Sequence, residues 1–369
     1  MIYQILARKW RPQSFDDIIG QKHIVQSISN GFSLGRIHHA WILSGTRGIG
    51  KTTIARILAK SLNCQMGVTS NACRKCNNCQ EIEKGKSLDF IEIDAASRTK
   101  VEEMREILDN VHYPPIKSRF KIYLIDEVHM LSRHSFNALL KTLEEPPKHI
   151  KFILATTNIE KVPDTIISRC LYFQLNILSE DNIFHTLVLI LKEECIKYEK
   201  EAIQTISYHS QGSMRDALNL LENAINSSYN YIKLKNINEM LGLPNKKNIF
   251  LLTKFLFKKD SRKIIFLLNK ISSIGVDWEN ILTEVLRFLH HIAMIKLYPK
   301  TWNNKFFQNT EKEQEIKKIA ENNDIKNIQI CYQILLNGRK KLIFSPSYKI
   351  GVEMTFLEAI EKIKNKNIF

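Results

Sequence analysis

The chain has 369 residues, 44% of them hydrophobic, which is typical of a globular protein of two or three domains. No apolar run approaches the ~20 residues of a membrane-spanning helix, and the N-terminus has no signal-peptide core, so we expect a cytoplasmic protein without a membrane partner. The net charge of +16 suggests an anionic partner such as nucleic acid. Most of the excess lies from Leu243 onward in a chain rich in Ile, Lys and Asn, so a generally solvated basic surface remains the alternative.

The first 39 residues precede the first expected strand. Loops are expected around Trp10 and Asp16, followed by a helix over 22–34. A segment of this kind can fold back over a nucleotide site and hold a base by apolar contact. Its residues alone do not predict that role.

Residues 45–52 (GTRGIGKT) fit the phosphate-binding pattern G-x-x-x-x-G-K-[ST]. The apolar run 40–44 predicts a strand before them, and the apolar spacing over 53–62 predicts a helix after them. This context favours a P-loop over the alternative of a chance glycine-rich turn. Lys51 would reach the β and γ phosphates, and the Thr52 hydroxyl would hold Mg²⁺. The residues expected to contact ATP here are Gly45, Thr46, Arg47, Gly48, Ile49, Gly50, Lys51, Thr52 and Thr53.

Four cysteines follow the P-loop helix with the spacing C-x8-C-x2-C-x2-C. They are Cys64, Cys73, Cys76 and Cys79. Zn²⁺ prefers four thiolates in a tetrahedron, so the spacing predicts a zinc module over 64–79. No histidine or aspartate is interleaved, which indicates a closed structural site. A cluster without metal is the alternative.

Four further apolar runs alternate with helical patterns. The strands are expected at 88–93, 120–125, 150–155 and 171–175, and the helices at 101–111 and 134–145. With the strand at 40–44 these predict an α/β fold, a parallel five-stranded sheet covered on both faces. Ligands of such sheets bind beyond the carboxyl ends of the strands.

The strand at 120–125 runs directly into Asp126 and Glu127, which is the Walker B arrangement. Asp126 would bind Mg²⁺ through its water, and Glu127 would polarise the water that attacks the γ phosphate. An ordinary turn is the alternative for an Asp-Glu pair. The P-loop upstream favours the functional interpretation.

From Ser179 onward we expect only helices. Residues 179–242 predict three short helices, and Gly242 to Asn245 marks a break before a helical remainder without catalytic motifs. The expected domains are therefore an ATPase domain over 1–178, a helical lid over 179–242 and an all-α domain over 243–369.

Several motifs together resemble one family. These are the P-loop with its inserted cysteine module, Asp126-Glu127-Val128-His129, Ser168-Arg169-Cys170 and Gly212-Ser213-x-Arg215-Asp216. Together with the runs 93–101 and 123–147, they are similar to the AAA+ clamp-loader ATPases of the bacterial DNA polymerase III gamma/tau family. The similarity is strong over 1–242 and weaker to the C-terminus. The chain ends near the collar domain, as in the short form of the family, which puts tethering of polymerase and helicase in doubt.

The resemblance implies roles that spacing does not show. Arg169 would act in trans on ATP bound by a neighbouring subunit, and Arg215 would sense the phosphates from the lid of its own subunit. Thr157 would be the polar sensor after the fourth strand, with Asn158 as an alternative. Further nucleotide contacts are implied for Arg8, Arg11, Pro12, Ile18, Ile19 and Met214. Contacts to primer-template DNA are implied for Arg98, Lys100 and Lys141.

The function implied is a DNA-stimulated ATPase, a motor that opens a sliding clamp and loads it onto primed DNA. The implied cofactors are ATP, Mg²⁺ and Zn²⁺. The implied partners are delta-like and delta-prime-like subunits in a hetero-pentamer joined through the collar, the sliding clamp, and the DNA. No polymerase active site is present in the sequence. The alternatives are a nucleotide-binding scaffold, which would need neither Glu127 nor Arg169, and an AAA+ helicase or branch-migration ATPase, which the cysteine module disfavours.

Overall fold

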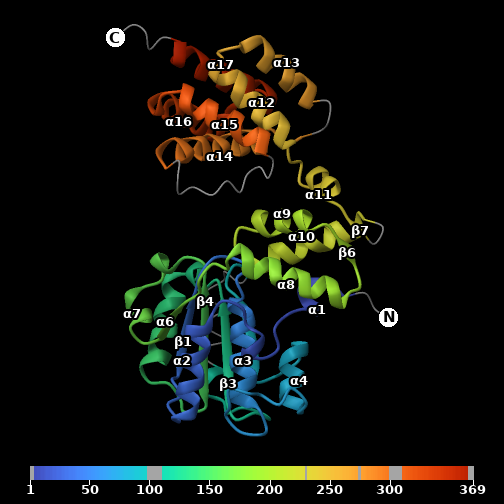
Figure 1. Ribbon diagram of the computed structural model, residues 1–369. Coiled ribbons are helices and arrows are strands. Elements are labelled where there is room, and N and C mark those ends of the chain that lie inside the picture. The colour runs from blue at the N-terminus through green and yellow to red at the C-terminus, as the bar shows by residue number, and fades with distance from the viewer. Residues whose placement is uncertain (1–3, 98–109, 229–230, 273–275, 299–309, 365–369) are drawn as a thin grey trace. The chain divides into compact units, whose positions relative to one another are not determined.

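The structure is a computed structural model and describes residues 4–97, 110–228, 231–272, 276–298 and 310–364. The chain divides into two compact units, residues 1–233 and 234–369, whose helices and strands are labelled in Figure 1. The helix expected over 101–111 lies outside the described residues except for its last two positions, where a short 3-10 helix begins. No helix in the described ranges is long and apolar enough to cross a membrane.

A parallel sheet of five strands forms the centre of the first unit, in the order β2-β3-β4-β1-β5. The strands are β1 (Ala40–Ser44), β2 (Phe90–Asp94), β3 (Lys121–Asp126), β4 (Ile150–Thr156) and β5 (Leu171–Gln174). Every residue of β1 and β4 is buried, because a central strand of a sheet covered on both faces has no solvent-exposed face. The α/β fold with a five-stranded parallel sheet is thus confirmed, and each strand begins or ends within two residues of its expected bounds.

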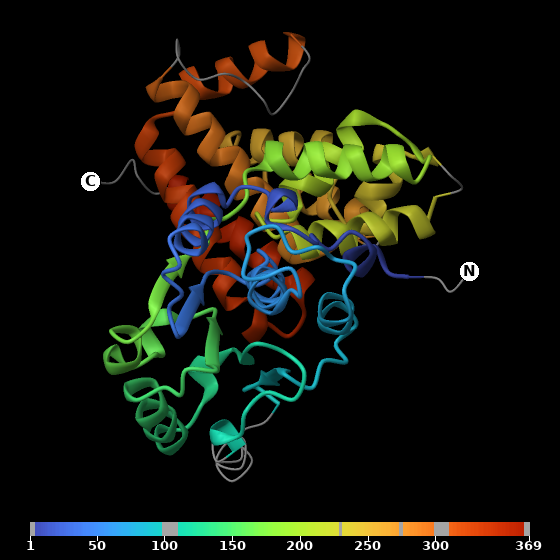
Figure 2. The same ribbon diagram turned by 90° about the horizontal axis from the view of Figure 1, so that it is seen from below.

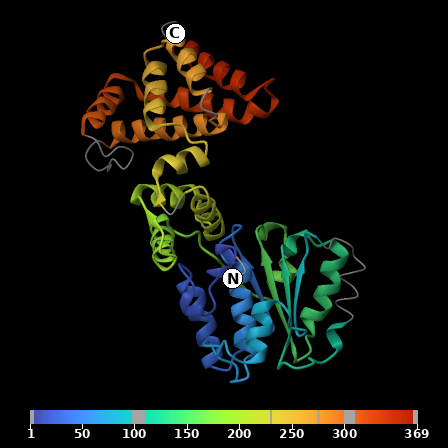
Figure 3. The ribbon, with the colours of Figure 1, turned by 90° about the vertical axis from the view of Figure 1, so that its right-hand side faces the viewer.

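Helices cover both faces of this sheet (Figure 3). One face carries α2 (Lys22–Ser33), α3 (Lys51–Asn63) and α4 (Asn77–Lys84), and the other carries α6 (Arg133–Glu144) and α7 (Asp164–Ile167). Alternate residues of β1 enter the two cores: Leu43 packs with α3, and Ile42 packs with α6. The carboxyl ends of β1 and β3 consequently point to one edge, where the P-loop begins.

Short elements connect these layers. They are α1 (Leu6–Lys9), η1 (Phe15–Asp17), η2 (Asn110–His112), η3 (Val128–Met130) and η4 (Ile159–Lys161).

The segment after β5 contains three helices and a two-stranded sheet that the sequence did not predict. The helices are α8 (Glu180–Glu193), α9 (Lys200–His209) and α10 (Met214–Asn226). β6 (Lys197–Tyr198) pairs in parallel with β7 (Tyr231–Ile232). The expectation of helices alone was wrong, because two-residue strands are too short to leave an alternating pattern. A fourth helix, α11 (Leu234–Met240), also lies in the range where three were expected, and it belongs to the second unit.

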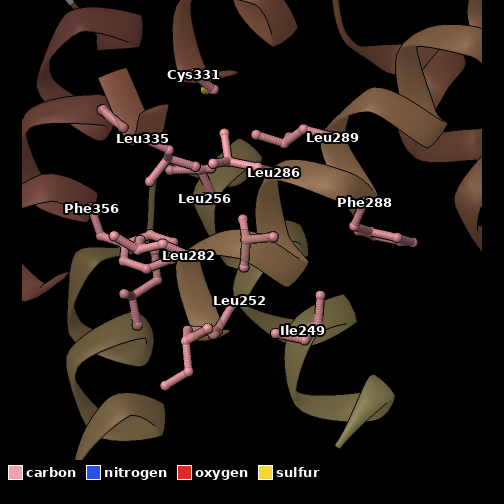
Figure 4. Packing of buried hydrophobic residues seen from close by; sticks show 14 of the residues in the cluster. Ile249, Leu252, Leu256, Leu282, Leu286, Phe288, Leu289, Cys331, Leu335 and Phe356 are labelled. Carbon is pink, nitrogen blue, oxygen red and sulfur yellow. The ribbon is translucent and has the colours of Figure 1, made fainter. Parts of the chain in front are cut away.

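The second unit is helical throughout its described residues, as expected. After α11 come α12 (Lys246–Phe257), α13 (Ser261–Ser272), α14 (Trp278–Leu297), α15 (Thr310–Asn322), α16 (Ile325–Lys341), η5 (Leu342–Phe344) and α17 (Tyr348–Lys364). The long helix α14 presents Leu282, Leu286 and Leu289 to a core shared with the other helices (Figure 4). Gly338 allows α16 and α17 to approach closely, since an added Cβ would lie 2.2 Å from Thr355 Cγ2.

Candidate active site

A cavity of about 590 Å³ opens where the P-loop, the N-terminal segment and α10 meet, a size suited to a small-molecule ligand. Its lining includes most of the residues that the sequence and the resemblance assigned to ATP. These are Arg8, Arg11, Pro12, Ile18, Ile19, Arg47, Gly48, Ile49, Gly50, Lys51, Thr52, Thr53, Asp126, Glu127, Met214 and Arg215. The structure therefore brings four distant segments of the chain, within 8–19, 47–53, 126–127 and 214–215, to one place.

The P-loop turns through glycines with a left-handed backbone before α3 begins. Gly48 has φ 79° and Gly50 has φ 105°, a region that residues with a Cβ rarely adopt. Gly48 also lets the lid approach, because an added Cβ would lie 2.0 Å from Ser213 Oγ. The backbone N–H of Arg215 donates to the Gly48 carbonyl oxygen at 3.3 Å. The start of α10 is thus fixed directly against the P-loop.

Lys51 is 5% exposed and is held by the loop that precedes it. Its Nζ donates to the carbonyl oxygens of Gly45 at 2.8 Å and Thr46 at 3.0 Å, so these two residues contact Lys51 and do not line the cavity. Burial lowers the pKa of Lys51, and the carboxylates of Glu127 and Asp126 act in the opposite direction. The buried ammonium group is thus held by its own loop, and Lys51 lines the cavity.

Thr52 and Asp126 form the pair of oxygen donors expected of a Mg²⁺ site. Thr52 Oγ1 donates to Asp126 Oδ2 at 2.9 Å, although the two residues are 74 positions apart. A hydroxyl and a carboxylate are ligands that Mg²⁺ accepts together with water and phosphate oxygens. These residues fit the ion that nucleotide chemistry needs.

Glu127 has a left-handed backbone, with φ 49°, at the junction between β3 and η3. Its Oε2 accepts hydrogen bonds from Thr157 Oγ1 at 2.8 Å and from Thr157 N at 3.2 Å, and His129 Nδ1 lies 3.4 Å away. The Asn158 side chain instead accepts from the Glu160 backbone N–H. The structure therefore places Thr157, and not Asn158, against Glu127.

The two predicted arginines lie in different surroundings. Arg215 lines the cavity. Arg169 does not: its Nη2 pairs with Glu144 Oε1 at 2.6 Å, and its Nη1 donates to the Thr165 carbonyl oxygen at 2.8 Å. The Arg169 side chain is 34% exposed.

Sequence reasoning missed several lining residues: Ile5, Ala7, Trp10, Ile54, Arg56, Glu83, Lys84, Gly85, Leu178, Leu218 and Asn219. Trp10 directly precedes Arg11 and Pro12, which were predicted to contact the nucleotide. This position in the sequence was the one signal that Trp10 lines the site. Arg56 lies beside Arg11, and burial followed by the charge of Arg56 lowers the pKa of Arg11. Arg56 itself pairs with Glu92. Basic side chains outnumber acidic ones in the lining, which favours an anionic ligand.

The four predicted metal ligands are brought together next to α3. The sulfur atoms of Cys64, Cys73, Cys76 and Cys79 all lie within 4.8 Å of one another. Tetrahedral Zn–S bonds of ~2.3 Å place sulfurs about 3.8 Å apart, so the group fits zinc. Backbone N–H groups of Cys76 and Lys75 lower the pKa of Cys73 to about 6, whereas burial raises the pKa of Cys79. A divalent cation would favour the thiolate form of all four.

Of the residues assigned to DNA, Lys141 is exposed on α6. Arg98 and Lys100 lie outside the described residues.

Family models match three consecutive segments of the chain. Their descriptions are "DNA polymerase III, delta subunit" over 20–179, "DNA polymerase III clamp loader subunit, ATPase lid domain" over 182–230, and "DNA polymerase III subunits gamma and tau domain III" over 232–367. DNA polymerase III subunit gamma of Buchnera aphidicola subsp. Schizaphis graminum is 70% identical over 364 residues, covering 99% of this chain and 100% of the relative. The chain belongs to the DNA polymerase III gamma/tau family. As a member of it, the chain is a clamp-loader ATPase subunit of the DNA polymerase III holoenzyme.

DNA polymerase III subunit tau of Escherichia coli (strain K12) is 50% identical over 360 residues, which are 98% of this chain and 56% of that relative. The chain thus spans about half the length of that longer gamma/tau relative. Among solved structures, the Thermotoga maritima RuvB Holliday junction branch migration motor matches 74% of this chain and 87% of its own, with 20% identity and a TM-score of 0.49.

Proposed function

We propose that this gamma/tau subunit binds ATP with Mg²⁺ in the described cavity and hydrolyses it, stimulated by DNA, to open a sliding clamp and load it onto primed DNA. The observation that carries the proposal is the contact between Thr52 Oγ1 and Asp126 Oδ2, with Glu127 held beside it by Thr157. This arrangement combines a pair of side chains suited to bind Mg²⁺ with the Glu127 carboxylate, whose direction is set by the neighbouring Thr157. A scaffold that only bound nucleotide would have no use for the carboxylate.

Some residues of the site bind ATP, and others contribute to its hydrolysis. Lys51 neutralises the phosphates, Thr52 and Asp126 hold Mg²⁺, and Arg215 reports the phosphates to the lid through its backbone contact with Gly48. Mg²⁺ supplies charge neutralisation at the phosphate oxygens when it is bound. Glu127 polarises the attacking water, and Thr157 fixes the direction of the Glu127 carboxylate.

Arg169 serves a neighbouring subunit. Its guanidinium lies outside the cavity of its own chain, on an exposed surface, which supports action in trans. The partners proposed are delta-like and delta-prime-like subunits in a hetero-pentamer joined through residues 243–369, the sliding clamp, and primer-template DNA near Arg98, Lys100 and Lys141. We place the assembly in the cytoplasm, with one Zn²⁺ per chain held by the four cysteines.

The test is steady-state ATP hydrolysis by the chain assembled with partner subunits, with and without the clamp and primed DNA. We expect the rate of ATP hydrolysis to increase when DNA and the clamp are both added. Lys51→Ala should reduce hydrolysis by at least about 100-fold, because the charge that meets the phosphates is lost. Lys22→Ala, at an exposed position outside the cavity lining, is the matched control and should behave as wild type. Wild-type turnover by Lys51→Ala, or hydrolysis indifferent to DNA, would contradict the proposal.

A further inference from the structure

Lys60 lies on α3, the helix that begins at the P-loop, and is 2% exposed. A buried ammonium group is costly unless it is hydrogen-bonded and its charge is compensated. The cavity does not include it. The partners of Lys60 therefore show what this side chain holds together.

One set of partners belongs to the N-terminal segment. Lys60 Nζ donates to the Gln13 carbonyl oxygen at 2.8 Å and to Gln13 Oε1 at 2.7 Å. Gln13 Nε2 in turn donates to the Arg11 carbonyl oxygen at 3.1 Å. Arg11 and Pro12 line the cavity, so Lys60 anchors the backbone immediately beside them.

Other charged groups surround Lys60 without a direct contact to it. Glu83 and Cys79 on α4, and Arg74 between the ligands, act electrostatically on Lys60, as does Asp17 from the N-terminal segment. Figure 2 looks along α3 and α4, blue and cyan, which lie side by side. Four thiolates around one Zn²⁺ leave a net negative charge, which would offset the charge of Lys60.

The helix α4, which carries Cys79, also reaches the cavity. Asn78 Nδ2 donates to the Asn63 carbonyl oxygen at 2.9 Å, which fixes α4 to the end of α3. The far end of α4 then contributes Glu83, Lys84 and Gly85 to the cavity lining. Arg74 Nη1 lies 3.8 Å from Asp17 Oδ2, an exposed pair that adds little by itself.

We propose that Lys60 is a positioning residue that fixes the N-terminal segment to α3, the helix to which the four-cysteine module is also attached, and so holds the wall of the cavity that receives the nucleoside of ATP. The inference rests on the proposed binding of ATP in this cavity. The N-terminal segment supplies apolar side chains, with Ile5, Pro12, Ile18 and Ile19, and also Arg8 and Arg11, whereas the P-loop supplies Lys51 and the glycine-rich backbone proposed to bind the phosphates. Because the P-loop is left intact, loss of Lys60 should weaken binding of ATP, which contacts both walls, more than binding of the phosphates alone.

The experiment compares ATP with inorganic tripolyphosphate, which lacks the nucleoside. Both are titrated with Mg²⁺ into the full chain by calorimetry. In Lys60→Met, which keeps the side-chain length and removes the charge, ATP should bind about tenfold more weakly, and tripolyphosphate should change by less than about twofold. Lys151→Met is the matched control, since Lys151 is 7% exposed, donates to the Ile37 carbonyl oxygen and does not line the cavity.

A second measurement does not depend on nucleotide. Amide hydrogen exchange at residues 11–19 of the nucleotide-free chain should be faster in Lys60→Met, while Lys151→Met exchanges there as wild type and zinc content stays unchanged in both. Equal weakening of ATP and tripolyphosphate, or unchanged exchange at 11–19, would overturn the positioning role. If the wild-type chain bound neither ligand, the proposed function would fail, and the exchange measurement would still decide for or against Lys60.

Discussion

Glu127 combines two features that mark functional residues. Its backbone is left-handed at φ 49°, which costs a residue with a Cβ of the order of 1 kcal/mol, and its carboxylate is held by a residue 30 positions away. The strain turns the side chain from the end of β3 toward Thr157 at the end of β4. Two adjacent parallel strands thus place an acid and its partner at the same edge.

At this scale we predict that Thr157→Val slows hydrolysis without weakening ATP binding. The substitution removes the hydroxyl that donates to Glu127 Oε2 and keeps the backbone N–H that also donates to it. A hydrogen bond to a charged group contributes ~1.5–3 kcal/mol, so turnover by the assembled complex should fall by about 10- to 100-fold. Single-turnover hydrolysis together with an ATP titration measures both quantities.

Asn158→Ala is the control for this prediction. The Asn158 side chain accepts from the Glu160 backbone N–H at the start of η4, whereas Glu127 Oε2 accepts from Thr157, so loss of the Asn158 side chain should alter turnover less. A larger defect in Asn158→Ala than in Thr157→Val would assign the sensor role to the other residue.

At the scale of elements, the four-cysteine module is small and carries little core of its own. In α4 only Asn78, Cys79 and Ile82 are buried, so the burial of side chains alone does not account for the folded conformation of the module. Backbone N–H groups of Cys73 and Cys76 donate to the sulfur atoms of Cys64 and Cys73, both at 3.4 Å. Such contacts orient the ligands of a closed metal site.

We therefore predict one zinc per chain and a loss of stability when it is removed. Cys76→Ser, or chelation of the wild-type chain, should lower the unfolding temperature by at least about 5 °C, because metal binding is coupled to folding of the module. Metal analysis and thermal unfolding measure the two effects. Cys195→Ser, at an exposed cysteine outside the cluster, is the control. A metal-free wild-type chain, or one equally stable after chelation, would contradict the assignment.

At the scale of the whole molecule, the two arginines assigned to hydrolysis cannot serve one cavity from their positions in this chain. Arg215 lines the cavity, whereas Arg169 pairs with Glu144 outside it. We therefore propose that Arg169 acts in the cavity of a second subunit. An arginine that supports phosphoryl transfer in trans is worth ~10³–10⁵ in rate in related hydrolases.

Arg169→Ala should accordingly leave ATP affinity of the isolated chain nearly unchanged, since Lys51, Thr52 and Asp126 are intact. Hydrolysis stimulated by DNA in the assembled complex should fall by at least about 10³-fold. Arg36→Ala, an exposed arginine on the same unit, should hydrolyse ATP as wild type.

Mixing distinguishes the trans role from a cis role. When chains carrying Lys51→Ala are combined with chains carrying Arg169→Ala, some interfaces pair an intact P-loop with an intact arginine, and activity should partly return. If recovery stayed at the level of leftover wild-type protein, and the isolated Arg169→Ala chain also lost its basal hydrolysis, Arg169 would act in cis.

Local spacing determined much of this protein in advance. Three motifs each predict a chemical role from a few neighbouring residues. They are the P-loop glycines, the pair Asp126 and Glu127 after a buried strand, and the C-x2-C spacings. Strand order could not be obtained that way, but the alternation of apolar runs and helical patterns was sufficient for a parallel five-stranded sheet. The helices of residues 246–364 followed from the same periodicity.

Tertiary structure decided the contacts that join residues far apart along the chain. Lys60 is hydrogen-bonded to Gln13, 47 positions away in the sequence, and Arg169 to Glu144, 25 positions away. No local sequence pattern predicts either pair. The wall formed by Glu83, Lys84 and Gly85 exists only because α4 is fixed against α3. The two-residue strands β6 and β7 likewise become strands only through each other. Local spacing fixes which groups are available, and the packing of helices and strands fixes which of them meet.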